Sequence, residues 1–273
     1  MPDSLASAIA LDALAVKMLC TTFVVVAVSW SVGALGPVIG GALSGLPIIL
    51  GPGFYFLIQQ SPLLFVSHAA TSALTALCAT QLFLLTYMAT ARWGRPLVSI
   101  VCAIGVWLLV AVICSSLSVP PMTGTLLYLG LTLVCLRVGR QWLLPTRAAA
   151  GRAGLSALLA RGVIAGCVVA AVTAASRWLG SAASGVLLAF PIGYTVISTT
   201  VHQKMGNAAV IATLYSSLLG TLSLACFCCV LSVMLPVWPA HLALVSALVA
   251  AVGATVCLIA VRSAWIRRKR RVS

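Results

Sequence analysis

The sequence has very little negative charge. Asp3 and Asp12 are its only acidic residues, against sixteen Lys and Arg, and both lie near the N-terminal edge. A buried carboxylate for acid–base catalysis is therefore not available, and the Asp or Glu proton carrier usual in membrane pumps is missing as well. No nucleophile elbow, zinc-ligand spacing or phosphate-binding glycine loop stands out. We therefore expect neither an enzyme nor a bound cofactor or metal.

Polar surface is also scarce. Hydrophobic residues make up 62% of the 273 and charged residues 7%, and the mean hydropathy is +1.19. Such a chain cannot cover a water-soluble globule with polar side chains, which predicts an all-α polytopic membrane protein. The net charge of +14 does not indicate a nucleic-acid partner, because the basic residues lie in short loops and a tail. The ten cysteines all fall in apolar runs, where a thiol packs as a small hydrophobe, so we expect no disulfides.

Long hydrophobic runs predict about nine transmembrane helices. A helix needs about 20 apolar residues to cross a bilayer, and the fifth run, which opens on Pro120-Pro121, is the shortest. The second and seventh runs are rich in glycine and proline, so re-entrant segments stay open as an alternative for this pair. The nine runs cover residues 13–34, 36–58, 63–91, 96–118, 120–136, 155–178, 181–202, 207–235 and 237–261.

The basic residues collect on one side of this arrangement when successive loops alternate. Lys17 and Arg177 alone fall on the other side. By the positive-inside rule, we expect the N-terminus on the outer side of the membrane and the C-terminus in the cytoplasm. The basic side carries Arg92, Arg95, Arg137, Arg140, Arg147, Arg152, Arg161, Lys204, Arg262, Arg267, Arg268, Lys269, Arg270 and Arg271.

Two interrupted hydrophobic segments, residues 36–60 and 180–203, match each other when residues 46–53 are aligned with residues 186–193. Proline removes a backbone donor and glycine loosens a helix, so each segment predicts a broken second helix in its half of the chain. Five spans separate the beginnings of the two halves. The halves should therefore enter the membrane in opposite directions, as in the inverted-topology repeats of secondary transporters.

This duplication divides the chain into four parts. Repeat one comprises residues 1–118 with spans one to four, and repeat two comprises residues 155–261 with spans six to nine. Residues 119–154 connect them through span five and a basic cytoplasmic loop, and residues 262–273 form a basic cytoplasmic tail. The tail either anchors the topology or contacts anionic lipid or a partner.

Interrupted helices leave backbone groups free in the membrane, so the two broken segments predict a substrate-binding site between them. Lys17 and Arg161 lie at matching depths in spans one and six and could attract an anionic group, with snorkelling to the interface as the alternative. Gln59, His68 and His202 lie near the segment ends, where a histidine could couple protons to transport or serve as an interfacial hydrogen-bonding group. The site residues within the segments are Ser44, Gly45, Pro47, Gly51, Pro52, Gly53, Ser184, Gly185, Pro191 and Gly193.

The first half carries Gly45-Leu46-Pro47 with Gly51-Pro52, and the second half carries Ser184-Gly185 with Phe190-Pro191. This duplicated motif resembles that of a group of uncharacterised bacterial inner-membrane proteins. The resemblance implies the bacterial inner membrane as the location, with a periplasmic N-terminus. The chain departs from that pattern at Ile48-Ile49-Leu50, where the group has a Thr-Ser pair, and at Ser181, where it has proline. The second half is also similar to the short GlpM-like membrane proteins. The resemblance implies a duplicated fold and no established substrate. The matching residues are Lys17-Met18-Leu19, Gly36-Pro37, Gly45-Leu46-Pro47, Gly51-Pro52, Gln59 or Gln60, Leu179-Gly180, Ser184-Gly185, Phe190-Pro191, His202-Gln203 and Gly206.

These observations predict a small secondary transporter or exporter that moves an organic or anionic solute through a site between the two broken helices. One alternative is a flippase for a lipid with a phosphate head group, held by Lys17 and Arg161. Another is a non-transporting membrane subunit that assists assembly of a partner. The expected partners are membrane lipids and a small-molecule or lipid substrate, without nucleic acid, and the sequence is compatible with a homodimer.

Overall fold

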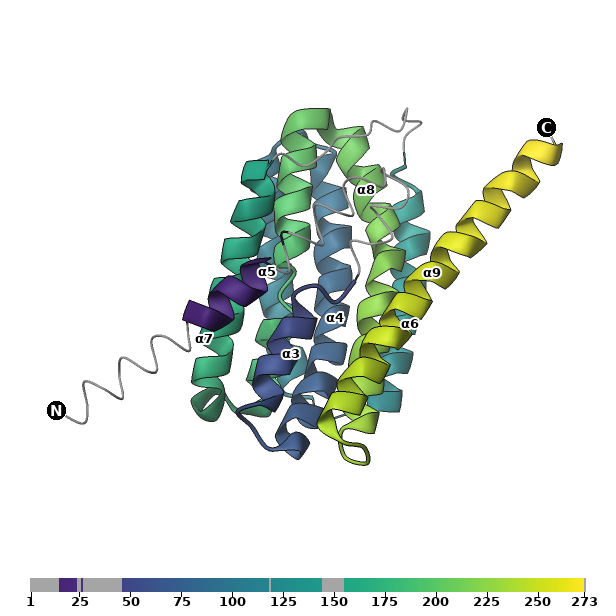
Figure 1. Ribbon diagram of the computed structural model, residues 1–273. Helices are drawn as coiled ribbons and strands as arrows, with labels where there is room; N and C mark the ends of the chain where they lie inside the picture. The colour runs from purple at the N-terminus through teal and green to yellow at the C-terminus, as the bar shows by residue number, and fades with distance from the viewer. Residues whose placement is uncertain (1–14, 24–25, 27–45, 118, 144–154, 273) are drawn as a thin grey trace.

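The computed structural model describes residues 15–23, 26, 46–117, 119–143 and 155–272, and every regular element within them is an α-helix (Figure 1). Residues 15–23 are helical. The predicted site residues Ser44 and Gly45 lie outside the described residues, as does much of the first two predicted spans. The further helices are α3 (Leu50–Ile58), α4 (Leu63–Ala91), α5 (Pro96–Ser115), α6 (Pro121–Arg140), α7 (Leu155–Leu188), α8 (Ile192–Met234) and α9 (Ala240–Val272).

Proline marks the start of three consecutive helices. α4 follows Pro62, and α5 and α6 begin on Pro96 and Pro121. Proline suits a helix start because its missing N–H would have no intrahelical acceptor there. The three helices coincide closely with the third, fourth and fifth predicted spans. Two further stretches join them: Leu158–Met234, which contains most of α7 and all of α8, and Ala240–Val261 of α9. Counted in this way, five described helices are long and apolar enough to cross a membrane.

Two glycines divide α7 and α8 into shorter helices. Gly180 (φ 75°, ψ 170°) and Gly206 (φ 81°, ψ −178°) adopt backbone angles that are essentially restricted to glycine. The chain reverses direction at both positions. Residues 181–205 therefore run between the two ends of the bundle in two helical pieces separated at residues 189–191 (Figure 1). This broken segment corresponds to the predicted seventh span.

Small residues allow α4 to occupy the centre of the bundle. Ala69, Ala70 and Ala73 are fully buried, and α5, α6, α7 and α8 all contact α4. α7 approaches very closely, because a Cβ atom at Gly185 would collide with the backbone carbonyl of Ala69. Ser184 beside it is fully buried as well. The predicted site residues Ser184 and Gly185 thus lie in a helix contact of the small-residue type common in membranes.

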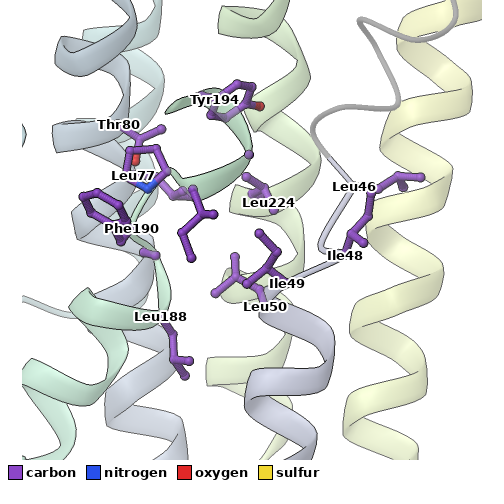
Figure 2. A pocket seen from close by; sticks show the side chains of 14 residues that line it. Leu46, Ile48, Ile49, Leu50, Leu77, Thr80, Leu188, Phe190, Tyr194 and Leu224 are labelled. Carbon is purple, nitrogen blue, oxygen red and sulfur yellow. The ribbon is translucent and has the colours of Figure 1, made fainter. Parts of the chain in front are cut away.

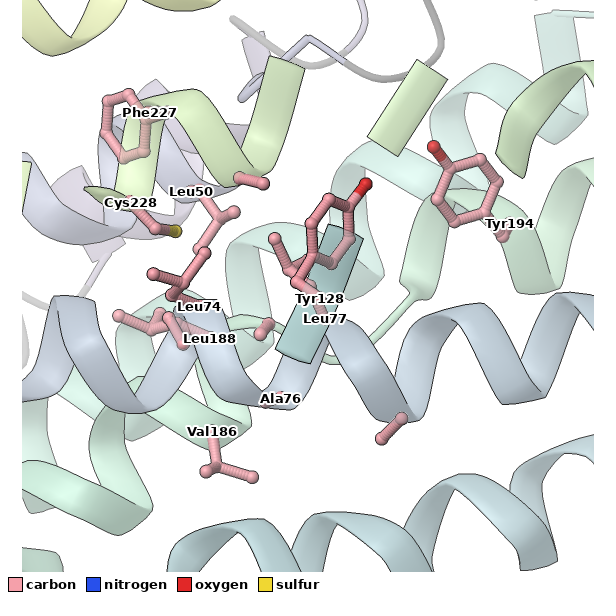
Figure 3. Close-up of a cluster of buried hydrophobic side chains, with 14 of the residues drawn as sticks. Leu50, Leu74, Ala76, Leu77, Tyr128, Val186, Leu188, Tyr194, Phe227 and Cys228 are labelled. Atoms are coloured by element: carbon pink, nitrogen blue, oxygen red, sulfur yellow. The ribbon is translucent and has the colours of Figure 1, made fainter. Parts of the chain in front are cut away.

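The hydrophobic core joins the first half of the chain to the second. Leu50 of α3, Leu188 of α7 and Cys228 of α8 belong to the same buried cluster as Leu74 and Leu77 of α4 (Figure 3). The outer helices instead expose large apolar side chains, as lipid contact requires. On α5, α6 and α9 these include Val101, Leu108, Leu109, Val112, Met122, Leu126, Leu133, Val134, Val245, Val249, Val252 and Val256.

Three connections meet at one end of the bundle. Gly94, between α4 and α5, lies beside Asn207, directly after the Gly206 turn. The guanidinium of Arg92 lies 5.9 Å from the ring centroid of Trp142, directly after α6. Arg92, Arg95, Arg140 and Lys204 are exposed here, and we call this the basic end. The charge distribution of the sequence assigns the same four residues to one side.

Candidate functional site

Proline interrupts both hydrophobic segments with the same short turn. In each turn, the N–H of the residue after proline donates to the carbonyl of the residue before it, at 2.7 Å in Leu46-Pro47-Ile48 and 2.8 Å in Phe190-Pro191-Ile192. A hydrogen bond between residues i and i+2 defines a γ-turn. Pro191 has φ −79° and ψ 53°, close to the inverse γ-turn minimum. Both interruptions are therefore defined, hydrogen-bonded turns.

A helix starts in the same way after each turn. The Pro47 carbonyl accepts from the Gly51 N–H at 2.7 Å, and the Pro191 carbonyl accepts from the Thr195 N–H at 2.9 Å. This pattern makes Pro47 the counterpart of Pro191, whereas the sequence alignment places Gly51 opposite Pro191, four residues away. α3 and the part of α8 before Gly206 leave their turns in opposite directions along the bundle (Figure 1).

A cavity of about 50 Å³ lies where the two turns meet (Figure 2). Ligand pockets for metabolites are roughly 300–1,000 Å³, so in this conformation the cavity has room only for a few waters. α4 and the later part of α8 close its walls. Its lining residues are Leu46, Ile48, Ile49, Leu50, Leu77, Thr80, Leu188, Ala189, Phe190, Pro191, Ile192, Gly193, Tyr194 and Leu224.

The polar side chains of the cavity are Thr80 and Tyr194, and both lie on its upper side in Figure 2. The indole N–H of Trp107 on α5 donates to the Thr80 hydroxyl at 3.3 Å. The same indole meets the Phe190 ring edge to face, with the centroids 4.9 Å apart. Trp107 therefore fixes one residue of the second turn and one polar group of the wall. Among the described residues that line the cavity, none has a charged side chain.

Several predicted site residues lie at or beside this cavity. Pro191 and Gly193 line it, and Pro47 and Gly51 are buried in the first turn and at the start of α3. Pro52 is half-buried in the first turn of α3, where its missing N–H costs little. Gly53 brings the two interrupted segments together, since a Cβ atom there would meet the side chain of Leu188 at 2.8 Å.

Other predicted site residues lie away from the cavity lining. Gln59 and His68 are exposed near the connection between α3 and α4. Lys17 is half-buried on the helix of residues 15–23, which packs against α7 near Gly162. Arg161 is in α7, and its side chain lies outside the described residues. The structure therefore does not place Lys17 among the groups that line the cavity.

His202 of α8 lies in a buried polar cluster at the basic end of the bundle. Its Nδ1 atom is 3.2 Å from the Tyr87 hydroxyl of α4, and its Nε2 atom is 3.1 Å from the Asn207 side-chain oxygen. His202 is 3% exposed and Tyr87 is fully buried. The sequence predicted His202 alone. A tyrosine within an otherwise apolar span, where its hydroxyl needs a partner, is the signal that could have identified Tyr87.

A second buried polar cluster surrounds Gln81 in the middle of α4. Its side-chain nitrogen lies 2.7 Å from the Thr132 hydroxyl of α6 and 3.0 Å from the Thr221 hydroxyl of α8. The Tyr128 hydroxyl is 2.7 Å from Thr221. These hydrogen bonds hold α4, α6 and α8 together in a region where an unpaired polar group would be costly. The sequence analysis did not identify this cluster, although an amide inside an apolar run is a signal for it.

No family model matches this chain, and comparison with curated proteins and with solved structures finds no match. The class of protein must therefore be inferred from the composition and the helices of this chain. Its composition and the five long apolar helices in its described part place it among the α-helical membrane proteins. Its particular function is a matter for proposal.

Proposed function

We propose that this protein is a small secondary transporter of the bacterial inner membrane, with its substrate site between the two proline turns. The observation that carries this proposal is the cavity at the meeting point of two equivalent turns, Leu46-Pro47-Ile48 and Phe190-Pro191-Ile192. In membranes, interrupted backbone is tolerated where it is enclosed by protein or faces a cavity. Paired interruptions are the usual place for a transporter's midplane site.

The arrangement of the two segments supports an inverted-topology repeat. α3 and the first part of α8 follow equivalent turns and run in opposite directions (Figure 1). α4 and the part of α8 after Gly206, the next helices in each half, also run in opposite directions. Two halves of this kind can rock against each other and open a shared cavity to either side in turn.

The cavity lining favours an uncharged or weakly polar organic solute. Aliphatic side chains dominate the described part of the lining, with the Thr80 and Tyr194 hydroxyls as hydrogen-bonding groups and no charged side chain among these residues. An anion bound there would lose its hydration without a compensating cation. The alternative of an anionic solute or lipid phosphate depends on a cation, such as Lys17 or Arg161, contacting the bound group.

A second function, a non-transporting subunit that assists assembly of a partner, is favoured by one observation. The cavity is small and mainly apolar, and closed packing at this place is what a subunit without a transport site would have. A transporter must admit water to the cavity in at least one conformation, whereas a subunit without a transport site need not. They therefore separate in an accessibility measurement.

Thiol labelling of Ala189→Cys provides that measurement. Ala189 lines the cavity and is 5% exposed, so a cysteine there fits in place of alanine. The matched control is Ala79→Cys, because Ala79 is fully buried on α4 and does not line the cavity. Both substitutions are made in a chain whose ten native cysteines are replaced by alanine or serine.

A transporter predicts that a small aqueous thiol reagent labels Ala189→Cys from one or both sides of the membrane while Ala79→Cys stays protected. Protection of both cysteines from both sides would favour the subunit function. Metabolite profiling of a deletion strain and its medium then identifies the solute. An exporter and an importer shift the intracellular pool in opposite senses.

A further inference from the structure

We propose that Tyr87, His202 and Asn207 form a proton-binding site at the basic end. Protonation of this site changes the access of water to the cavity. The proposal deepens the transport function above and rests on it. Its structural basis is a buried imidazole with a partner on each ring nitrogen, the Tyr87 hydroxyl at Nδ1 and the Asn207 oxygen at Nε2.

The same two partners can satisfy His202 in both of its protonation states. In the neutral ring, the Nε2–H donates to the Asn207 oxygen and Nδ1 accepts the Tyr87 hydroxyl proton. In the imidazolium, both ring nitrogens donate, and the Tyr87 oxygen becomes an acceptor. The Ser198 hydroxyl lies beside Tyr87 and can then accept its proton. A buried histidine can therefore gain and lose a proton here without leaving a polar group unpaired.

Residues 192–205 form a helix that ends at the Gly206 turn, and His202 lies in its last turn. The free carbonyls and the helix dipole at such an end favour a cation. His202 contacts Tyr87 of α4 and Asn207 of α8, and Lys204 follows it two residues later; Lys204, Arg92 and Arg95 are exposed cations of the basic end. The free carbonyls at the helix end and the cations of the basic end therefore act on the protonation of His202 in opposite senses.

Residues with hydroxyl groups lie between this site and the cavity. Tyr194, Ser198 and His202 are spaced four residues apart on the first part of α8, so they follow one face of that helix. The distance from Tyr194 to His202 along the helix axis is about 12 Å at 1.5 Å per residue. On α4, Thr80 and Tyr87 are seven residues apart and also share a face. Tyr194 and Thr80 line the cavity at one end of this path.

The proton balance is simple. A proton from water at the basic end adds to the His202 ring, forming one N–H bond and one positive charge. Its release, either back to that water or through the Tyr87 and Ser198 hydroxyls toward the cavity, restores the neutral ring. Since the first part of α8 carries both His202 and the second proline turn, a change in charge at one end acts directly on the element that borders the cavity.

The direct test is histidine 15N NMR on the full-length protein in lipid nanodiscs, without substrate. The chain has three histidines, and His68→Gln, His202→Gln and His241→Gln assign their signals. As the pH is lowered across the measured range, we expect His202 to change from the Nε2–H neutral tautomer to imidazolium. We also expect Tyr87→Phe, which keeps the ring but removes the hydroxyl, to move the midpoint or change the tautomer. A single neutral tautomer throughout that range would overturn the proposal.

The coupling itself is tested by labelling Ala189→Cys at pH 5.5 and pH 8.5, with rates divided by those of an exposed reference, Gln60→Cys, to remove thiol ionisation. We expect the corrected rate to change about fivefold or more, the lower range of ordinary coupling, and His202→Gln to remove the change. A titrating His202 with a labelled but pH-independent Ala189→Cys would overturn the coupling. Ala189→Cys protected at both pH values would overturn the transport function, while the NMR result would still decide whether His202 binds a proton.

Discussion

Gly185 is the position where the α4–α7 contact leaves no room for a side chain. A Cβ atom there would collide with the Ala69 carbonyl, and backbone cannot move aside as a flexible side chain can. Overpacking costs about 1–3 kcal/mol, and we expect Gly185→Ala to lie at or above the upper end. The measurement is the unfolding temperature of the purified protein in detergent, which should fall by about 5 °C or more.

Gly253 supplies the matched control for this substitution. It lies in α9, and a Cβ atom there would meet nothing within 4 Å. Alanine is favoured over glycine inside a helix by about 1 kcal/mol, so Gly253→Ala should leave the unfolding temperature unchanged or raise it slightly. Equal losses from Gly185→Ala and Gly253→Ala would contradict the close contact between α4 and α7.

The partners of His202 mark the limit of what could be predicted for the candidate site. The sequence indicated His202 because it is a polar residue at the end of an interrupted segment. Its partner Tyr87 is 115 residues away in the chain, and hydrophobic periodicity does not tell which polar groups of separate helices will meet. Gln81 was missed for the same reason, since its partners lie on α6 and α8.

The Gly206 turn sets the path of α8, and it should be sensitive to any side chain. Its φ of 81° with ψ of −178° is accessible essentially to glycine alone, although a Cβ atom would meet nothing within 4 Å. Strain of this kind costs about 1–3 kcal/mol, so Gly206→Ala should lower the unfolding temperature through the backbone and not through packing. Gly130→Ala in α6, which also has open space around the Cβ position, is the control and should show no loss.

The sequence predicted where some helices begin and end, but it did not predict which residues of the two halves are equivalent. α4 occupies the predicted residues 63–91 because an apolar run and flanking proline and basic residues define both ends. The two interrupted segments, in contrast, were aligned with Gly51 opposite Pro191, whereas the turns pair Pro47 with Pro191. In apolar sequence, a shift of four residues is about one helical turn and preserves the buried face, so composition alone cannot distinguish the two alignments.

Considered as one molecule, the chain brings its two interrupted segments together from residues about 140 apart. Gly53 of α3 packs on Leu188 of α7, and the turns of both segments line one cavity. α4 supports both segments through its small buried residues, while α5, α6 and α9 present apolar faces outward. A movement that separates the turns would therefore open the cavity without exposing the outer helices to water, as alternating access requires.

The distribution of charge over the two ends leads to a prediction for the topology of the whole chain. Arg92, Arg95, Arg140 and Lys204 are exposed at the basic end, and short basic connections are retained in the cytoplasm. A reporter inserted at Gly94 or fused after Ser273 should therefore read cytoplasmic. A reporter inserted at Gln60, between α3 and α4, or placed before Met1 should read periplasmic. If the reporters at Gly94 and Gln60 lay on one side, α4 would not cross the membrane. If the two terminal reporters agreed, the number of spans would be even and the inverted repeat would lose its basis.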